Sequence, residues 1–275
     1  MSGSITDAVS ARLREAGAVA RELDLYEGAG TDFYERLVGS DRAEIREMLG
    51  LARGTEGPIL DLAAGSGRLT IPLVRSGKRV TAVDLSDDML SHLRRALPHH
   101  PLLECIVADM RDIALGQRYE LVIIGATSIT LLDSDGRSLL YANVRRHLAV
   151  GGVFAFTVAA GASAQSLALS REEEVRVPGP DGDETYLFVQ QREEGGAVRL
   201  VNWIRAADLR SGGEVTVLTS RLRVLSHEVL SRELVAAGFV SPIVSPVRTH
   251  RGQDILLLTT SWAGRSSVMD DDATQ

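Results

Sequence analysis

Residues 59–69, ILDLAAGSGRL, join a short apolar run to a turn of small residues. The run is bounded by Gly57-Pro58 on one side and by the turn on the other, which is typical of a buried strand. The turn has the composition of a nucleotide-binding loop, but Ala63 occupies the first glycine position and no Lys-Ser/Thr pair follows to hold a phosphate. The stretch therefore predicts a strand, a tight turn and a helix, with a ligand other than a simple phosphate.

The same pattern continues along the chain. Further strands are predicted at 79–85, 102–110, 119–126, 152–159 and 254–262, with helices at 67–77, 87–97, 135–149 and 227–239. Strands and helices that alternate with short turns indicate right-handed βαβ units, hence an α/β fold with a mainly parallel sheet covered on both faces. The nearly continuous apolar runs of the strands agree with burial on both faces.

The sequence is predicted to fall into five parts, of which the core is the second. Residues 1–55 are expected to form a helical N-terminal lid, with an amphipathic helix over 5–24 and one or two helices over 32–52. Residues 56–161 form the predicted core, and 162–226 an insertion of three or four antiparallel strands. A helix and a strand in 227–263 complete the core, and the polar tail 264–275 is expected to be disordered.

Composition narrows the class of protein. The chain has 275 residues, of which 44% are hydrophobic and 24% charged, and its formal net charge is −7. An acidic chain without a basic stripe is a poor candidate for binding nucleic acid. With Cys105 as its single cysteine and no long apolar run, we expect a cytoplasmic protein without a disulfide or membrane contact.

Acidic or small residues follow four of the predicted strands. Asp61 and the small turn follow the first, and Asp84, about 20 residues further on, is placed to accept hydrogen bonds from the two hydroxyls of a ribose. Asp109 and Met110 after the third strand suit an adenine amine and ring, and Gly125-Ala126-Thr127 after the fourth give a floor of small residues. Because parallel strands end at one edge of the sheet, these residues predict a single site.

This set of motifs resembles the class I S-adenosylmethionine-dependent methyltransferases over roughly residues 56–160. DLAAGSG matches a variant of the first motif of that family, and AVDLSDDML and ADMRD match the next two. The resemblance implies a Rossmann-like, doubly wound, mainly parallel sheet of seven strands, with S-adenosylmethionine as cofactor and S-adenosylhomocysteine as product. The implied cofactor-binding residues are Tyr34, Asp61, Ala63, Gly65, Gly67, Asp84, Leu85, Met89, Asp109, Met110, Ala126 and Thr127.

The acceptor of the methyl group is less well specified. DFYERL, residues 32–37, is similar to a motif of small-molecule N-methyltransferases, in which the tyrosine corresponding to Tyr34 lies over the methionine end of the cofactor. The similarity extends to amino-sugar N,N-dimethyltransferases and to daptide-type ribosomal-peptide methyltransferases. It implies an amine acceptor, either an amino sugar or a C-terminal peptide amine, and a homodimer through the β insertion. Candidate acceptor contacts are Tyr26, Ser128, Tyr186 and Trp203.

Several alternatives remain open at the level of sequence. The chain could methylate oxygen or carbon of a small metabolite, or bind the cofactor only as a scaffold; the missing glycine pattern argues against a nicotinamide-dependent oxidoreductase. No catalytic residue is assigned, because methyl transfer to a neutral amine needs positioning more than acid–base chemistry. His227 and His250 are dispersed candidates for a base. No metal site is expected, since Asp133 and Asp135 are better explained as a helix N-terminus.

Overall fold

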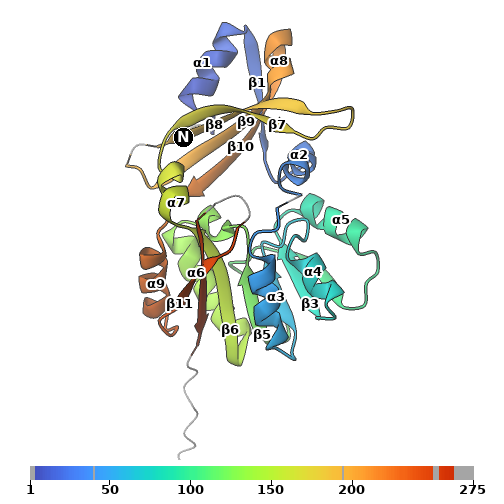
Figure 1. Cartoon of the computed structure of the whole chain (residues 1–275), viewed down its shortest axis with the longest axis vertical. Coiled ribbons are helices and arrows are strands. Elements are labelled where there is room, and N and C mark those ends of the chain that lie inside the picture. The colour runs from blue at the N-terminus through green and yellow to red at the C-terminus, as the bar shows by residue number, and fades with distance from the viewer. Residues whose placement is uncertain (1–3, 40, 194, 250–253, 263–275) are drawn as a thin grey trace, which may run out of the picture.

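A computed structural model describes residues 4–39, 41–193, 195–249 and 254–262. Its larger sheet has seven strands in the order β11-β12-β6-β5-β2-β3-β4, in the lower half of Figure 1. Five neighbouring strands are parallel, and β12 runs antiparallel to both β6 and β11. This is the mainly parallel, seven-stranded Rossmann-like sheet that the sequence predicts. The strands are β2 (Ile59–Leu62), β3 (Val80–Asp84), β4 (Leu103–Val107), β5 (Tyr119–Ile124), β6 (Leu148–Ala159), β11 (Ile243–Val247) and β12 (Ile255–Ser261).

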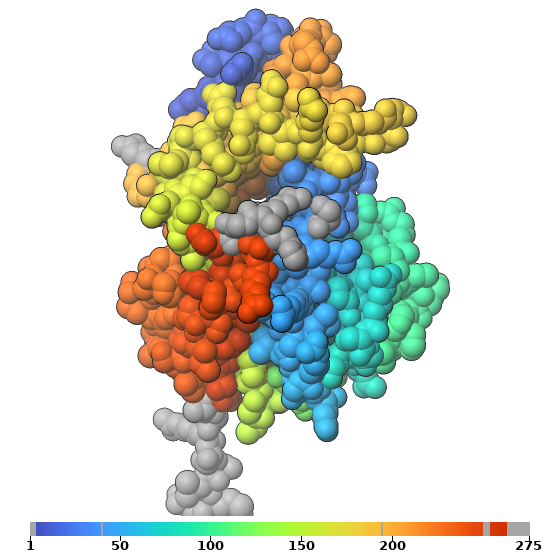
Figure 2. Space-filling view, viewed as in Figure 1, coloured from blue at the N-terminus to red at the C-terminus, as the bar shows by residue number. Residues whose placement is uncertain are grey.

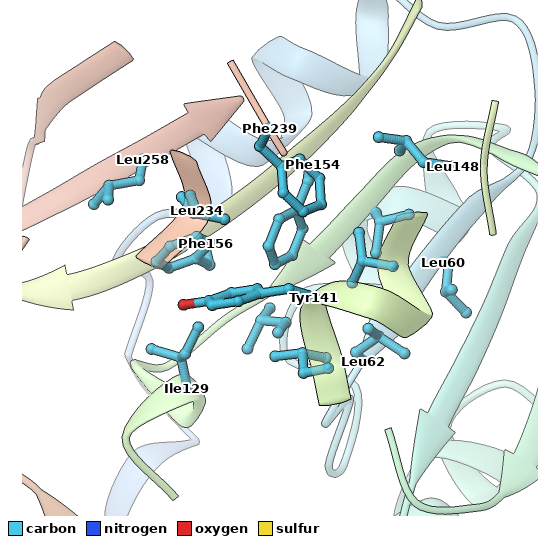
Figure 3. Close-up of a cluster of buried hydrophobic side chains, with 14 of the residues drawn as sticks. Leu60, Leu62, Ile129, Tyr141, Leu148, Phe154, Phe156, Leu234, Phe239 and Leu258 are labelled. Atoms are coloured by element: carbon cyan, nitrogen blue, oxygen red, sulfur yellow. The ribbon is translucent and has the colours of Figure 1, made fainter. Parts of the chain in front are cut away.

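Helices cover both faces of this sheet. One face packs against α3 (Ile45–Arg53), α4 (Thr70–Arg75) and α5 (Asp87–Ala96). The other packs against α6 (Ser134–His147) and α9 (His227–Ala236), where Tyr141 and Leu234 meet Phe154 and Phe156 of β6 (Figure 3). The side chains of each strand alternate between these two cores, which is why the strands are apolar at successive positions.

A second sheet of five strands lies above the first in Figure 1, in the order β1-β10-β9-β8-β7. Four of its strands form the antiparallel insertion that the sequence predicts: β7 (Arg171–Val177), β8 (Glu184–Arg192), β9 (Val198–Arg205) and β10 (Gly213–Arg223). The fifth, β1 (Ala18–Asp24), pairs in parallel with β10. Helix α1 (Asp7–Glu15) packs on the outer face of this sheet, and α7 (Gly161–Leu167) and α8 (Ala206–Ser211) flank it.

The prediction of one helix over residues 5–24 is wrong for its second half. The helix ends at Glu15, and Gly17, with a φ of 62°, turns the chain into β1. The spacing of Ala and Val also suits a strand, and pairing with a distant strand decides between the two. Strand β11 was likewise not identified from the sequence. The expected disorder of 264–275 lies outside the described residues, and the five-part division of the chain stays a prediction.

Helix α2 (Ala29–Val38) connects the two sheets and lies between them in Figure 1. Its Phe33 is 2% exposed and packs on the inner face of the second sheet, with ring centroids 4.4 Å from Tyr186 and 5.2 Å from Trp203. This cluster fixes the position of the lid segment that precedes the core. No helix in the described ranges has the length and apolarity needed to cross a membrane.

We expect Phe33→Ala to lower the free energy of unfolding by about 3–5 kcal/mol, because it leaves a cavity among fully buried rings. Val19→Ala is the matched control, since Val19 is 69% exposed on β1 and its truncation should change stability by less than about 0.5 kcal/mol. Urea unfolding followed by tryptophan fluorescence measures both. Equal effects of the two substitutions would contradict the packing role of Phe33.

Candidate active site

A cavity of about 360 Å³ opens where strands β2, β3, β4 and β5 end, under the lid segment around α2. Ligands of doubly wound sheets bind at this edge because the loops after the strands converge there. Five carboxylates line the cavity, together with two arginines, two tyrosines and the turn of small residues after β2. The five carboxylates are those of Asp24, Glu27, Asp61, Asp84 and Asp109.

The turn after β2 brings its backbone close to the cavity. Ala63 and Gly65 both adopt left-handed conformations, with φ of 53° and 55°, so the alanine holds a conformation that favours glycine. A Cβ atom added at Gly65 would meet nothing within 4 Å, because that side of the turn is open. Gly67 is needed for a different reason: a Cβ atom there would come within 2.4 Å of the Leu93 side chain, so only glycine lets the turn pack closely against α5.

Asp84, at the end of β3, organises the turn. Its Oδ2 accepts a hydrogen bond of 2.8 Å from the Gly65 amide, and its Oδ1 accepts one of 2.9 Å from the Ser86 amide. Burial raises the pKa of Asp84, while these amides oppose the rise. Each carboxylate oxygen has a second lone pair, so Asp84 can still accept hydrogen bonds from two ligand hydroxyls.

Asp61 also lines the cavity, but its side chain is almost fully buried, at 1% exposure. Its Oδ2 accepts a hydrogen bond of 2.6 Å from the Thr70 hydroxyl at the start of α4. Burial raises the pKa of Asp61 to about 7, although the Thr70 hydroxyl and the nearby Arg68 both act to lower it. The carboxyl is therefore divided between its neutral and charged forms near neutral pH.

Asp109, after β4, forms a local ion pair on the cavity wall. Both of its carboxylate oxygens accept hydrogen bonds from Nε of Arg111, at 2.9 Å each. Hydrogen bonding from Arg111 holds the pKa of Asp109 below its usual range. The adenine amine that the sequence analysis expects here would share this carboxylate with Arg111, a partner that the sequence did not single out.

Glu44, which the sequence analysis missed, joins the lid to the core. Its side chain is 2% exposed and accepts hydrogen bonds from Arg68, from the Thr157 hydroxyl and, at 2.6 Å, from the Ala126 amide. Arg68 also donates to the Ala43 carbonyl at 2.8 Å. Glu44 lies in a polar segment, and no local sequence pattern indicates that such a glutamate is buried. The one hint in the sequence is its partner Arg68, which directly follows the glycine turn.

Two tyrosines of the lid segment close the cavity from above. The rings of Tyr26 and Tyr34 meet edge to face, with centroids 5.3 Å apart. Burial raises the pKa of both hydroxyls, so both stay neutral at neutral pH. The lid is tied to α5, because the Gly28 amide donates to Asp88 at 2.8 Å and His92 lies 3.3 Å from Asp32.

The structure brings together most of the predicted site residues. Those that line the cavity are Tyr26, Tyr34, Asp61, Ala63, Gly65, Asp84, Leu85, Met89, Asp109, Met110, Ala126 and Ser128. Four do not line it. Gly67 packs against α5, and the Thr127 amide donates to the Thr157 hydroxyl at 3.4 Å. Tyr186 and Trp203, expected near the acceptor, are 7% and 8% exposed in the aromatic cluster around Phe33, behind the lid.

The remaining candidate acids and bases lie elsewhere. Asp133 caps α6 by accepting the Gly136 amide at 2.8 Å, as the sequence predicts. His227 begins α9 and pairs with Glu228 at 3.4 Å, away from the cavity wall. His250 lies outside the described residues. Within the described ranges, no group of three His, Cys, Asp or Glu residues is arranged to hold a metal ion.

Comparisons with known proteins agree with this geometry. Residues 59–152 match a family described as a methyltransferase domain. A glycopeptide N-methyltransferase, MtfA, solved with S-adenosylhomocysteine, is 31% identical over 94% of this chain and 98% of its own, with a TM-score of 0.63. The chain belongs to the class I S-adenosylmethionine-dependent methyltransferases.

Curated relatives match a shorter stretch. The dTDP-3-amino-3,4,6-trideoxy-alpha-D-glucopyranose N,N-dimethyltransferase of Streptomyces venezuelae is 27% identical over 46% of this chain and 51% of its own length. The cypemycin N-terminal methyltransferase of a Streptomyces species is 28% identical over 34% of this chain and 38% of its own length. The alignments with these methyltransferases thus span about half of the relatives, or less.

The cavity of this methyltransferase fits its cofactor. Asp84 retains lone pairs that a ribose could use, the side of the turn at Gly65 is open to a ligand, and Leu85, Met89 and Met110 offer an apolar wall that an adenine could contact. The excess of carboxylates over arginines suits a cationic sulfonium. Both cavity arginines are already paired, Arg68 with Glu44 and Arg111 with Asp109.

We expect Asp84→Ala to weaken binding of S-adenosylhomocysteine by about 1–3 kcal/mol, because it removes an acceptor from buried hydrogen-bond donors. Asp87→Ala is the matched control, since Asp87 is exposed on the adjacent α5 and pairs with Arg94. Isothermal titration calorimetry measures both. Unchanged affinity in Asp84→Ala would contradict the placement of the ribose at β3.

Asp61 predicts a pH dependence of stability. Because its pKa is about 7 in the folded protein, above the unfolded value near 3.8, its contribution to stability is full below about pH 4 and is lost as pH rises through 7. Relative to Asp61→Asn, the wild-type protein should lose about 3 kcal/mol of stability between about pH 5 and pH 8, at about 1.4 kcal/mol for each pH unit below the folded pKa. Urea unfolding of both proteins without cofactor measures this difference, and a difference that does not change with pH would contradict it.

Proposed function

We propose that the chain transfers a methyl group from S-adenosylmethionine to an amine of a natural product, either a peptide amine or an amino sugar. The observation that carries this proposal is the 31% identity with a glycopeptide N-methyltransferase over nearly the whole of both chains. The alignment covers 94% of this chain, so it takes in the second sheet and the lid as well as the cofactor-binding core. The curated amino-sugar and peptide N-methyltransferases support the same class of acceptor.

The surroundings of the cavity favour an amine. When bound, the cofactor supplies a methyl group activated by its sulfonium. The acceptor nitrogen must lie in line with the bond from sulfur to methyl carbon, in a site from which water is excluded. Tyr26 and Tyr34 shield the upper side of the cavity and present neutral hydroxyls, which can orient an acceptor by hydrogen bonds. Asp24 and Glu27 bring negative charge near the same side, which attracts a protonated amine.

This arrangement acts by positioning more than by proton transfer. Of the described residues that line the cavity, none is a histidine. The carboxylates at the rim can take a proton from an arriving ammonium, or the amine can lose it to water before it binds. Ser128 also lines the cavity, at the start of the short 3₁₀ helix η1 (Ser128–Leu131), where its hydroxyl could contact the acceptor.

Incubation with S-adenosylmethionine and a panel of amino sugars, peptides with free amines and phenols tests the proposal. We expect a mass gain of one or two methylene units on an amine, detected by mass spectrometry, and S-adenosylhomocysteine release in proportion. Asp84→Ala should reduce the rate at low cofactor concentration, while Asp87→Ala should not. Methylation confined to phenols, or cofactor binding without any turnover, would contradict N-methylation.

A further inference from the structure

The inner face of the second sheet, the face that packs against α2, carries polar groups near the cavity. This face is defined by Tyr186, Phe188, Val201, Trp203 and Leu218, which cluster with Phe33 and Tyr34 of α2. Because side chains alternate along a strand, Arg199 of β9 points to the same side as Val201 and Trp203. Figure 2 shows the molecule hollowed beneath β7 and β8, on this side of the sheet.

Arg199 does not line the cavity itself, but it lies on the inner face close to Tyr26, which does. Arg199 of β9 is paired with Leu222 of β10 in the sheet. The residue after Leu222, Arg223, forms an ion pair with Asp133 at 3.8 Å, which relates this end of β10 to the core. Asp133 follows directly on η1 and Leu132, and η1 contacts β10. On the other side, the charge of Arg199 acts on the hydroxyl of Tyr26, which lines the cavity.

Arg199 is a cation without a carboxylate partner in the described ranges of the chain. Its Nη1 donates to the Gln190 side-chain oxygen at 2.7 Å, and it forms no ion pair with another described residue. Burial, with a smaller contribution from Arg171, lowers the pKa of Arg199 to about 10, so the group stays charged at neutral pH. The cavity arginines differ, since each has its own carboxylate. A partly buried and unpaired guanidinium is costly and is stabilised by an anion that binds to it.

A second donor lies on the same face. Ser220 of β10 is 8% exposed, and its Oγ is buried without a hydrogen-bond partner among the described residues. Ser220 is paired with Val201 of β9 in the sheet, and Leu222, two residues further along β10, is paired with Arg199. Ser220 and Arg199 are therefore diagonal neighbours on the same face. Unsatisfied buried hydroxyls are rare in folded proteins, and the Ser220 hydroxyl keeps a donor that no described residue uses.

We propose that Arg199 and Ser220 bind a carboxylate of the methyl acceptor while its amine reaches the cavity past Tyr26. The inference rests on the proposed function and narrows it to amines that also carry a carboxylate, such as an amino acid or a peptide with a free carboxyl group. A guanidinium fork matches the two oxygens of a carboxylate. One unpaired arginine balances a single negative charge and leaves the second charge of a diphosphate unmatched, so a sugar nucleotide is the disfavoured acceptor.

Acetate is the probe, and nuclear magnetic resonance of protein labelled with ¹⁵N-arginine is the readout. In protein saturated with S-adenosylhomocysteine, sodium acetate should shift the Arg199 Nε–Hε signal saturably, whereas sodium chloride at equal ionic strength should not. Arg199→Gln identifies the signal and should remove the acetate site. Ser220→Ala should raise the acetate Kd up to about tenfold, the effect of one lost hydrogen bond.

Arg205→Gln is the matched control, because Arg205 is on the same strand and is already paired with Glu184 at 2.8 Å. It should leave the acetate Kd unchanged. If Arg199→Gln does not fold, Arg199→Lys, which keeps the charge but not the fork, replaces it. No saturable shift in the wild-type protein, an equal loss in Arg205→Gln, or pyrophosphate binding more tightly than acetate would each overturn the inference. Failure to bind S-adenosylhomocysteine would instead contradict the proposed function, and acetate titration of the cofactor-free protein would still decide the carboxylate site.

Discussion

Parallel strands that run side by side end at the same edge of a sheet, and the site of this protein depends on that constraint. Strands β2, β3, β4 and β5 each end in residues that can face a ligand, and the sheet order places these ends next to one another. Asp84 then acts across two of them, because its carboxylate accepts the amide of Gly65 from the neighbouring turn. The first turn and the second strand are thus held in one geometry before any ligand binds.

The lid over the cavity is attached to both sheets of the protein. Glu44 brings a buried carboxylate to the ends of β5 and β6 and to Arg68 of the first turn. Phe33 anchors α2 to the inner face of the second sheet, and Gly28 ties the lid segment to α5. The roof of the cavity, with Tyr26 and Tyr34, therefore depends on contacts with both sheets.

The two sheets of this methyltransferase carry different kinds of groups. The seven-stranded sheet carries the groups that suit the cofactor, and the five-stranded sheet carries, behind the lid tyrosines, polar groups that the cofactor does not need. Arg199 lacks a carboxylate partner among the described residues and lies close to Tyr26, and the hydroxyl of Ser220 on the neighbouring strand has no partner there. An enzyme that works by positioning needs a second point of attachment for its acceptor, and the inner face of the five-stranded sheet offers one.

The sequence by itself determined the core of the fold and most of the residues that line the cavity at the strand ends, because they depend on local signals. Apolar runs, small turns and acids at strand ends are read directly from Asp61, Asp84 and Asp109 and their neighbours. Tertiary structure alone decided that 18–24 form a strand, since β1 exists only through its pairing with β10. It also decided that Glu44 is buried, that Tyr186 and Trp203 pack behind the lid, and that Arg199 lacks a carboxylate among the described residues. Each of these depends on residues far apart in the chain, and contacts of that kind leave no periodicity or spacing in the sequence.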